Sequence, residues 1–302
     1  MSYGNLYLDL LCKLITMRKI LIYPITLISF ISFALLTSCG NGKDEQSDKA
    51  IAAAAAKDTN KVDELTQFKY DKLISNVPIP FDILKAHADV PLAYNADAVN
   101  PASNLNYYSS STSKALNLGI YGGDMAYSIT YEKFEEMGKY LKCVKKLADD
   151  LGIPLAFDQK ALGTYKKYGT NKDSLEKIIF SSYSEVDKTL KSNERIGLAS
   201  LVVTGGWLEG LYATLTTLGP APKSDKTKGI YKKIWEQKNH LNMIIELLSQ
   251  FKDDAIFSSV VTDLSGIKSV YENLAVKSEI NESELATLTQ KVGEMRAKVI
   301  SH

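Results

Sequence analysis

The segment that most constrains this fold is Ile196–Leu218, a long apolar stretch whose only charged side chain is Glu209. An apolar helix with so little charge has to be buried on most of its sides. Gly205, Gly206 and Gly210 would each cost such a helix up to about 1 kcal/mol relative to alanine. Close packing of a neighbouring helix, or a bound ligand, has to offset that cost. The segment therefore predicts a helix in the core of the protein.

The rest of the chain also shows helical periodicity. Within Glu132–Leu151, the residues Tyr140, Val144, Leu147 and Leu151 form one apolar stripe. No run of alternating apolar and polar residues bounded by turn residues indicates a strand. We expect residues 91–110 to form a loop. The sequence predicts an all-α fold, a multi-helix bundle of roughly 8–10 helices. The other expected helices are Val62–Ser75, Phe81–Val90, Ser113–Tyr131, Asp158–Tyr168, Asp173–Lys191, Lys226–Phe251, Asp254–Lys277 and Ser283–Ser301.

Two parts of the sequence resemble each other. Gly122-Gly123-Asp124 lies in an apolar helix that precedes a charged amphipathic one, and Gly205-Gly206-Trp207 does the same 83 residues later. A duplicated helix-pair arrangement about a pseudo-twofold axis would explain this repetition. Chance similarity between two glycine-containing core helices explains it as well.

The N-terminal part is typical of a secretory signal. Met17-Arg18-Lys19 provides a basic start, and the uncharged apolar stretch Ile20–Leu36 follows. The next residues, Leu36-Thr37-Ser38-Cys39, resemble the lipobox of bacterial lipoproteins, which implies cleavage before Cys39 and acyl chains such as palmitate on that cysteine. We therefore predict a signal peptide at residues 1–38, with its true start at Met17. The alternative is an uncleaved transmembrane anchor.

The residues after the lipobox indicate location. Residues 39–60 are predicted to be a lipidated flexible tether, and residues 61–302 a single α-helical domain. Gly40 after the cysteine favours the outer membrane by analogy, and Lys43-Asp44-Glu45 resembles the export signal of surface lipoproteins in Bacteroidetes. The sequence leaves open whether the domain faces the periplasm or the cell surface.

The charge balance excludes one class of partner. The chain has 36 basic and 35 acidic side chains, so no cationic excess is available to neutralise a phosphate backbone. We expect no nucleic acid partner. The predicted partner is the membrane, through lipid on Cys39, and an unidentified protein or glycan is a further possibility.

Two isolated carboxylates are the strongest candidates for chemistry. Glu209 and Asp124 each lie in an apolar helix, where a carboxylate has to be paired, hydrogen-bonded or protonated. They can converge on a central site that holds a cation, an amine or sugar hydroxyls. Alternatively, each accepts hydrogen bonds that fix how core helices cross. The candidate buried polar or ligand site consists of Asp124, Glu209, Tyr121, Tyr127, Trp207 and Tyr212.

Other residues give weaker indications. The pair of Glu236 and His240 has no second such pair to complete a metal site, and no zinc-binding spacing occurs. We predict no metal, no cofactor and no catalytic residue outside the carboxylate pair. Cys143 lies among lysines, which favour a reactive thiol, although a buried inert cysteine explains it better. Tyr107-Tyr108, in a segment with Asn104 and Asn106, can form a stacking surface for a glycan or peptide.

The mature part, with Asn117–Asp124 and Gly205–Tyr212, resembles a family of uncharacterised Bacteroidetes-type lipoproteins, and this resemblance implies a location without an activity. The leading hypothesis is a non-enzymatic envelope lipoprotein with a binding or scaffolding role. One alternative is an enzyme that uses Asp124 and Glu209 in a central pocket. Another is a subunit of an outer-membrane complex.

Overall fold

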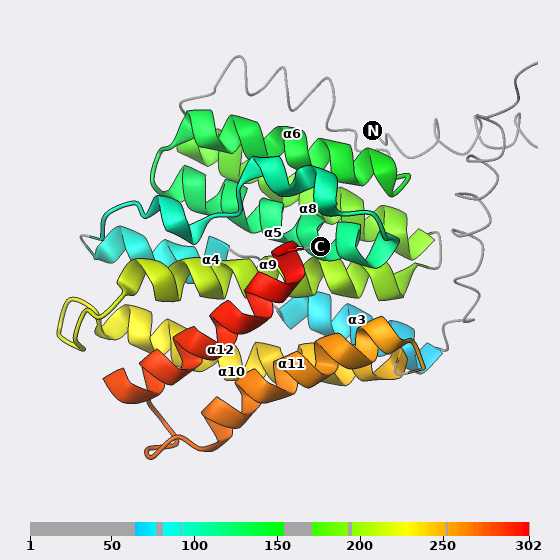
Figure 1. The fold of residues 1–302 in the computed structure, drawn as a ribbon. Helices are drawn as coiled ribbons and strands as arrows, with labels where there is room; N and C mark the ends of the chain where they lie inside the picture. Colours follow the sequence, from blue (N-terminus) through cyan, green and yellow to red (C-terminus); the bar gives the residue numbers. More distant parts are fainter. Residues whose placement is uncertain are drawn as a thin grey trace, which may run out of the picture. The chain divides into compact units, whose positions relative to one another are not determined.

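The computed structural model describes residues 64–76, 81–90, 92–153, 171–192, 195–251 and 253–301. Within these ranges the secondary structure is entirely helical, which confirms the predicted all-α multi-helix bundle (Figure 1). The predicted signal peptide, tether and 158–168 helix lie outside the described residues. The α-helices are α3 (Glu64–Asn76), α4 (Phe81–Leu84), α5 (Ser111–Thr130), α6 (Phe134–Asp150), α8 (Lys172–Ser192), α9 (Ile196–Leu218), α10 (Lys228–Leu248), α11 (Ala255–Glu272) and α12 (Glu282–Ser301). The 3-10 helices are η1 (Lys85–Asp89), η2 (Ala96–Ala98), η3 (Ala102–Tyr107) and η4 (Ser249–Phe251).

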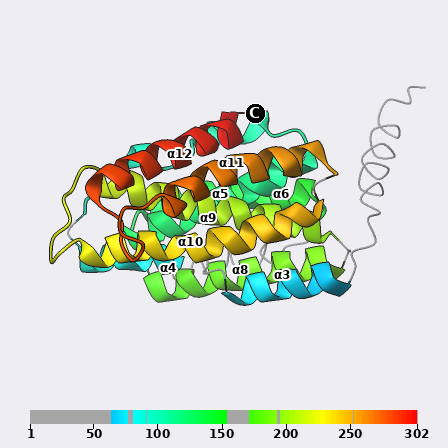
Figure 2. The same ribbon diagram turned by 90° about the horizontal axis from the view of Figure 1, so that it is seen from below.

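Helix α9 lies at the centre of the bundle, as its sequence predicts. It packs against α5, α8, α10 and α12, and the two views show these helices on different sides of it (Figures 1 and 2). By length and composition α9 could cross a membrane, but 89% of its most apolar window is buried inside the bundle. The burial makes α9 the core helix of this domain, because its apolar surface is already covered by protein.

Helices α5 and α9 touch through their backbones. A Cβ atom on Gly119 would lie 2.1 Å from the carbonyl oxygen of Val202, and one on Gly205 would lie 2.0 Å from that of Leu116. Only glycine fits at these two positions, so close helix packing offsets the low helix propensity of both residues. Four residues later on α5, a Cβ on Gly123 would meet Glu209 of α9. The residue numbers in contact therefore rise together along α5 and α9, so the two helices run parallel.

This crossing is locally symmetric. Gly119 approaches Val202 and Gly206, and Gly205 approaches Leu116 and Ile120. Adding 86 to the residue numbers of Gly119, Leu116 and Ile120 gives those of Gly205, Val202 and Gly206, so each helix makes the same contacts with the other. The structure therefore pairs Gly119 with Gly205, and not the Gly-Gly pairs whose spacing of 83 residues suggested a duplication. The symmetric contact therefore does not follow the repetition in sequence, because the two differ in offset by three residues.

The amphipathic helices follow their patterns with small corrections. All four residues of the predicted α6 stripe, Tyr140 to Leu151, are buried. Helix α11 ends at Glu272, before the predicted Lys277, because the side chain of Asn273 donates to the carbonyl oxygen of Ser269 at 2.9 Å. The predicted loop 91–110 contains η2 and η3. Asn95 begins η2 by accepting a hydrogen bond from the backbone of Asp97.

Candidate functional site

An ion pair between α9 and α12 lies at the centre of the core. Both oxygens of Glu209 accept hydrogen bonds from Arg296, one from Nε and one from Nη2, each at 2.7 Å. Glu209 is 0% exposed and Arg296 is 5% exposed. The guanidinium also lies 4.1 Å from the ring centre of Tyr212, an arrangement that favours the cation. These contacts raise the pKa of Arg296 despite its burial, so the guanidinium stays charged.

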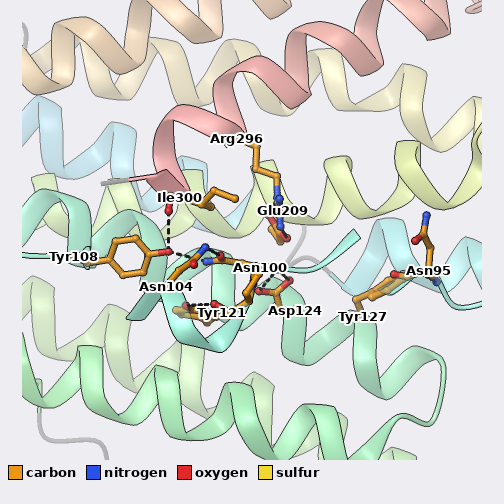
Figure 3. A network of polar contacts seen from close by, with 11 residues as sticks. Asn95, Asn100, Asn104, Tyr108, Tyr121, Asp124, Tyr127, Glu209, Arg296 and Ile300 are labelled. Carbon is orange, nitrogen blue, oxygen red and sulfur yellow. Dashed lines mark hydrogen bonds and ion pairs between the residues drawn. The ribbon is translucent and has the colours of Figure 1, made fainter. Parts of the chain in front are cut away.

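Asp124 lies against the same carboxylate. It comes from α5 and is 0% exposed, and Figure 3 shows Glu209 between Arg296 and Asp124. Burial, the charge of Glu209 and the hydrogen bond with Glu209 raise the pKa of Asp124 well above its usual range. The raised pKa favours the protonated form of Asp124, and in that form Asp124 can donate its proton to Glu209. The cluster then holds one carboxylate, one carboxylic acid and one guanidinium. Its formal charges sum to zero within the protein.

The segment between η2 and η3 covers Asp124. The backbone N–H of Asn100 is 3.3 Å from both oxygens of Asp124. The Asn100 side chain donates to the hydroxyl of Tyr108 at 2.9 Å and accepts from Asn104 at 2.8 Å (Figure 3). Tyr121 donates to the carbonyl oxygen of the adjacent Pro101 at 3.0 Å. The polar groups in this segment therefore form a connected network that closes one side of the carboxylate pair.

The same network holds the last turn of α12. Asn117 on α5 donates to the carbonyl oxygen of Val299 at 2.9 Å, and Tyr108 donates to that of Ile300 at 3.4 Å. The carbonyl groups of a final helical turn lack partners within their own helix. Other parts of the chain supply those partners here, so α12 is fixed to the core by its side chain Arg296 and by its backbone end.

The structure brings together most of the residues singled out in the sequence, but not all of them. Asp124 and Glu209 meet, Tyr212 contacts their guanidinium partner, and Tyr121 lies in the covering network. Trp207 instead donates to Gln237 on α10 at 3.1 Å. Tyr127 lies apart from the cluster and bonds to Asn95 and Thr217 (Figure 3).

Tyr127 belongs to a second buried cluster, built around His87. The Nδ1 atom of His87 is 2.8 Å from the hydroxyl of Tyr131, and Nε2 is 3.1 Å from that of Thr214. Thr214 donates its own proton to the carbonyl oxygen of Gly210, so Nε2 carries the imidazole proton and Nδ1 accepts. Burial lowers the pKa of His87 to about 4, and the ring is neutral at pH 7. Tyr94 packs on Tyr127 with ring centres 5.2 Å apart.

Three of the other sequence candidates have different surroundings. Tyr107 is 57% exposed, but Tyr108 is only 4% exposed, so the two do not form one stacking surface. The Nδ1 atom of His240 is 3.1 Å from the side-chain oxygen of Gln237. Burial raises the pKa of Cys143 to about 11, which keeps its thiol protonated at neutral pH. Among the described residues, no group of His, Cys, Asp or Glu side chains is arranged to hold a metal ion.

Sequence reasoning missed Arg296, Asn100 and His87 as core polar residues. Arginine is rare in this chain, which contains only Arg18, Arg195 and Arg296. That rarity was a usable signal, since arginine is the cation best suited to a buried carboxylate. Asn100 carries no comparable signal, because the predicted loop 91–110 resembles an ordinary surface loop. His87 carries none either, because a single histidine in the short predicted helix Phe81–Val90 suits a surface or a core position equally well.

Comparison with known proteins adds no function. The chain matches no protein-family model, no curated protein and no solved structure.

Proposed function

We propose that this chain is a lipid-anchored protein of the bacterial outer membrane whose helical domain binds or scaffolds a partner and does not catalyse a reaction. The anchoring rests on Leu36-Thr37-Ser38-Cys39 behind the apolar stretch Ile20–Leu36. The observation that carries the non-catalytic role is the ion pair of Glu209 and Arg296. Both oxygens of that carboxylate are engaged by the protein's own guanidinium, which supports a structural role for the polar core.

The enzyme hypothesis gains little from the same residues. A catalytic pair of carboxyl groups has to reach the scissile bond and water. Asp124 and Glu209 meet, but each is 0% exposed. Asn100 covers one of them and Arg296 binds the other. Their arrangement favours a role in fixing α5, α9 and α12 to one another.

The complex-subunit hypothesis predicts a continuous apolar patch on the C-terminal helices. Among the described residues in that region, Ile256 is 43% exposed and Val276 is 49% exposed. Ile256 lies in the first turn of α11 and Val276 lies after the end of that helix, and single exposed apolar residues are ordinary on protein surfaces. A binding role through a polar surface is therefore the better-supported alternative.

Anchoring is tested by replacing the lipidated residue. We expect the wild-type protein to incorporate labelled palmitate and to sediment with outer membranes, and Cys39→Ala to lose both properties. Cys143→Ala is the matched control, because that thiol is buried in the domain. If Cys39→Ala stays in the membrane without label, the N-terminal segment is an uncleaved anchor.

The binding role is tested on the native lipoprotein. Chemical cross-linking in cells, followed by purification and mass spectrometry, should recover one protein or glycan in a fixed ratio. Asp124→Asn should retain that partner, because the proposal places binding outside the buried cluster. A partner lost specifically in Asp124→Asn, with the fold intact by circular dichroism, would favour the enzyme hypothesis.

A further inference from the structure

A surface hollow of about 1150 Å³ lies where η1 meets the beginning of α10. In both ribbon views α10 begins at the end of the bundle opposite to that where α3 begins (Figures 1 and 2). The hollow shares no lining residue with the buried cluster of Asp124, Glu209 and Arg296. The side chains that define its chemistry are Lys85, Lys226, Lys228, Lys233, Trp235 and His240.

The lining of this hollow is cationic in a nearly neutral protein. Four lysines line it against two carboxylates, Asp225 and Glu236, although the whole chain has a net charge of only +1. Lys228 is 2.9 Å from Asp225, but these side chains are 66% and 97% exposed. Water screens such a pair strongly, so Lys228 can exchange its carboxylate for a ligand. Lys226 is exposed and forms no ion pair with any other described residue.

The helix beneath these lysines adds to the positive potential. The first turn of α10 contains no acidic residue, and no side chain caps it. The hydroxyl of Thr227 is already engaged, since it donates to the carbonyl oxygen of Pro222 at 2.7 Å. Lysines near the positive end of a helix dipole repel it. This local arrangement works against the stability of α10, and a bound anion would relieve it.

The kinds of side chain present indicate the kind of anion. The hollow is lined by lysines and by no arginine. Lysine binds phosphate groups as a point charge, whereas the arginine fork binds carboxylates and phosphates through two fixed hydrogen bonds, so this lining suits an anion that is recognised by its charge. Trp235 contributes an indole ring, held in place where its Nε1 donates to the carbonyl oxygen of Lys277 at 3.1 Å. An aromatic wall beside ammonium groups suits a phosphoryl group carried on a larger body.

We propose that this hollow is a binding site for a phosphate-bearing ligand, held by Lys226 and Lys228 with Lys85 and Lys233 and packed against Trp235. This inference rests on the proposed binding role and names the ligand chemistry for it. A soluble phosphate ester and the headgroup of an anionic lipid share this chemistry.

The test uses the purified full-length lipoprotein in neutral detergent, with tryptophan fluorescence as the readout. Trp207 and Trp235 are the only tryptophans in the chain, and Trp235→Phe identifies the signal of the hollow. Inorganic phosphate is titrated in one arm, and micelles containing phosphatidylglycerol or phosphatidylcholine in the others. We expect saturable binding that weakens as the salt concentration rises. Binding of inorganic phosphate would indicate a soluble phosphate ester as the ligand. Binding of phosphatidylglycerol micelles alone would indicate a lipid headgroup.

The decisive comparison is between two charge-matched double variants. Lys226→Gln with Lys228→Gln should weaken binding at least about tenfold. Lys139→Gln with Lys291→Gln removes the same charge from two exposed lysines outside the hollow, each of which pairs with a glutamate three residues away as Lys228 pairs with Asp225. This control variant should leave binding unchanged. Equal effects of the two variants, or no saturable binding in any arm, would overturn the site. Loss of membrane attachment in Cys39→Ala would remain as separate support for the proposed anchoring.

Discussion

The core cluster and the surface hollow use similar charged groups for opposite purposes. In the core, Glu209 and Arg296 are at most 5% exposed and bind each other through two hydrogen bonds. In the hollow, Lys228 and Asp225 form a pair that is largely in water. A buried charge has to be compensated permanently, whereas an exposed one can change partners. Burial therefore decides which charged residues in this protein build the fold and which remain available.

The largest effect is expected from breaking the core ion pair. Glu209→Gln leaves the guanidinium of Arg296 buried without a carboxylate, which should lower the free energy of unfolding by about 3–5 kcal/mol. Asp124→Asn should change it by less than about 1 kcal/mol, because an amide still accepts from Asn100 and donates to Glu209. Urea unfolding at pH 7 measures both values.

The hollow provides the control for that measurement. Glu236→Gln removes a carboxylate that pairs with Lys233 at 2.9 Å on the surface, and should change stability by no more than about 0.5 kcal/mol. Similar losses for Glu209→Gln and Glu236→Gln would contradict the contrast between the two regions.

His87 should make stability depend on pH. It belongs to η1, the same 3-10 helix that supplies Lys85 to the hollow, but its ring is buried. Burial lowers the pKa of His87 from 6.5 to about 4, so between these values the unfolded chain binds more protons. The free energy of unfolding should therefore fall as the pH falls from 6.5 to 4, by up to about 3 kcal/mol.

Unfolding of the wild type and His87→Gln across this pH range isolates that contribution. The variant should lose most of the slope, since glutamine does not titrate. A wild-type slope retained in His87→Gln would mean that carboxylates cause it.

Two glycines, one in each region, should respond to alanine with opposite signs. Gly205→Ala places a Cβ atom 2.0 Å from the Leu116 carbonyl oxygen and should destabilise the protein by about 1–3 kcal/mol as α5 and α9 separate. Gly229 in the hollow has no atom within 4 Å of such a Cβ. Gly229→Ala should stabilise the protein by up to about 1 kcal/mol, through better helix propensity. Thermal unfolding of both variants checks the opposite signs.

Much of this fold follows from local sequence patterns. The low charge of Ile196–Leu218 predicts the core helix, and the isolated carboxylates Asp124 and Glu209 are buried as expected. The partner of Glu209 could not be predicted in this way, because Arg296 lies 87 residues away on a helix whose pattern is that of an ordinary surface helix. Periodicity reports which face of a helix is buried, but not which distant side chain meets it.

The position of Arg296 on α12 also bears on the order in which the protein assembles. Helices α5 and α9 can meet through their glycines early, but the carboxylate of Glu209 then enters an apolar environment without its cation. Arg296 reaches Glu209 only when α12 docks, and this brings together two residues that are 87 positions apart in the chain. The cost of the unpaired charge penalises partly folded states, so the buried ion pair makes folding of the bundle more cooperative.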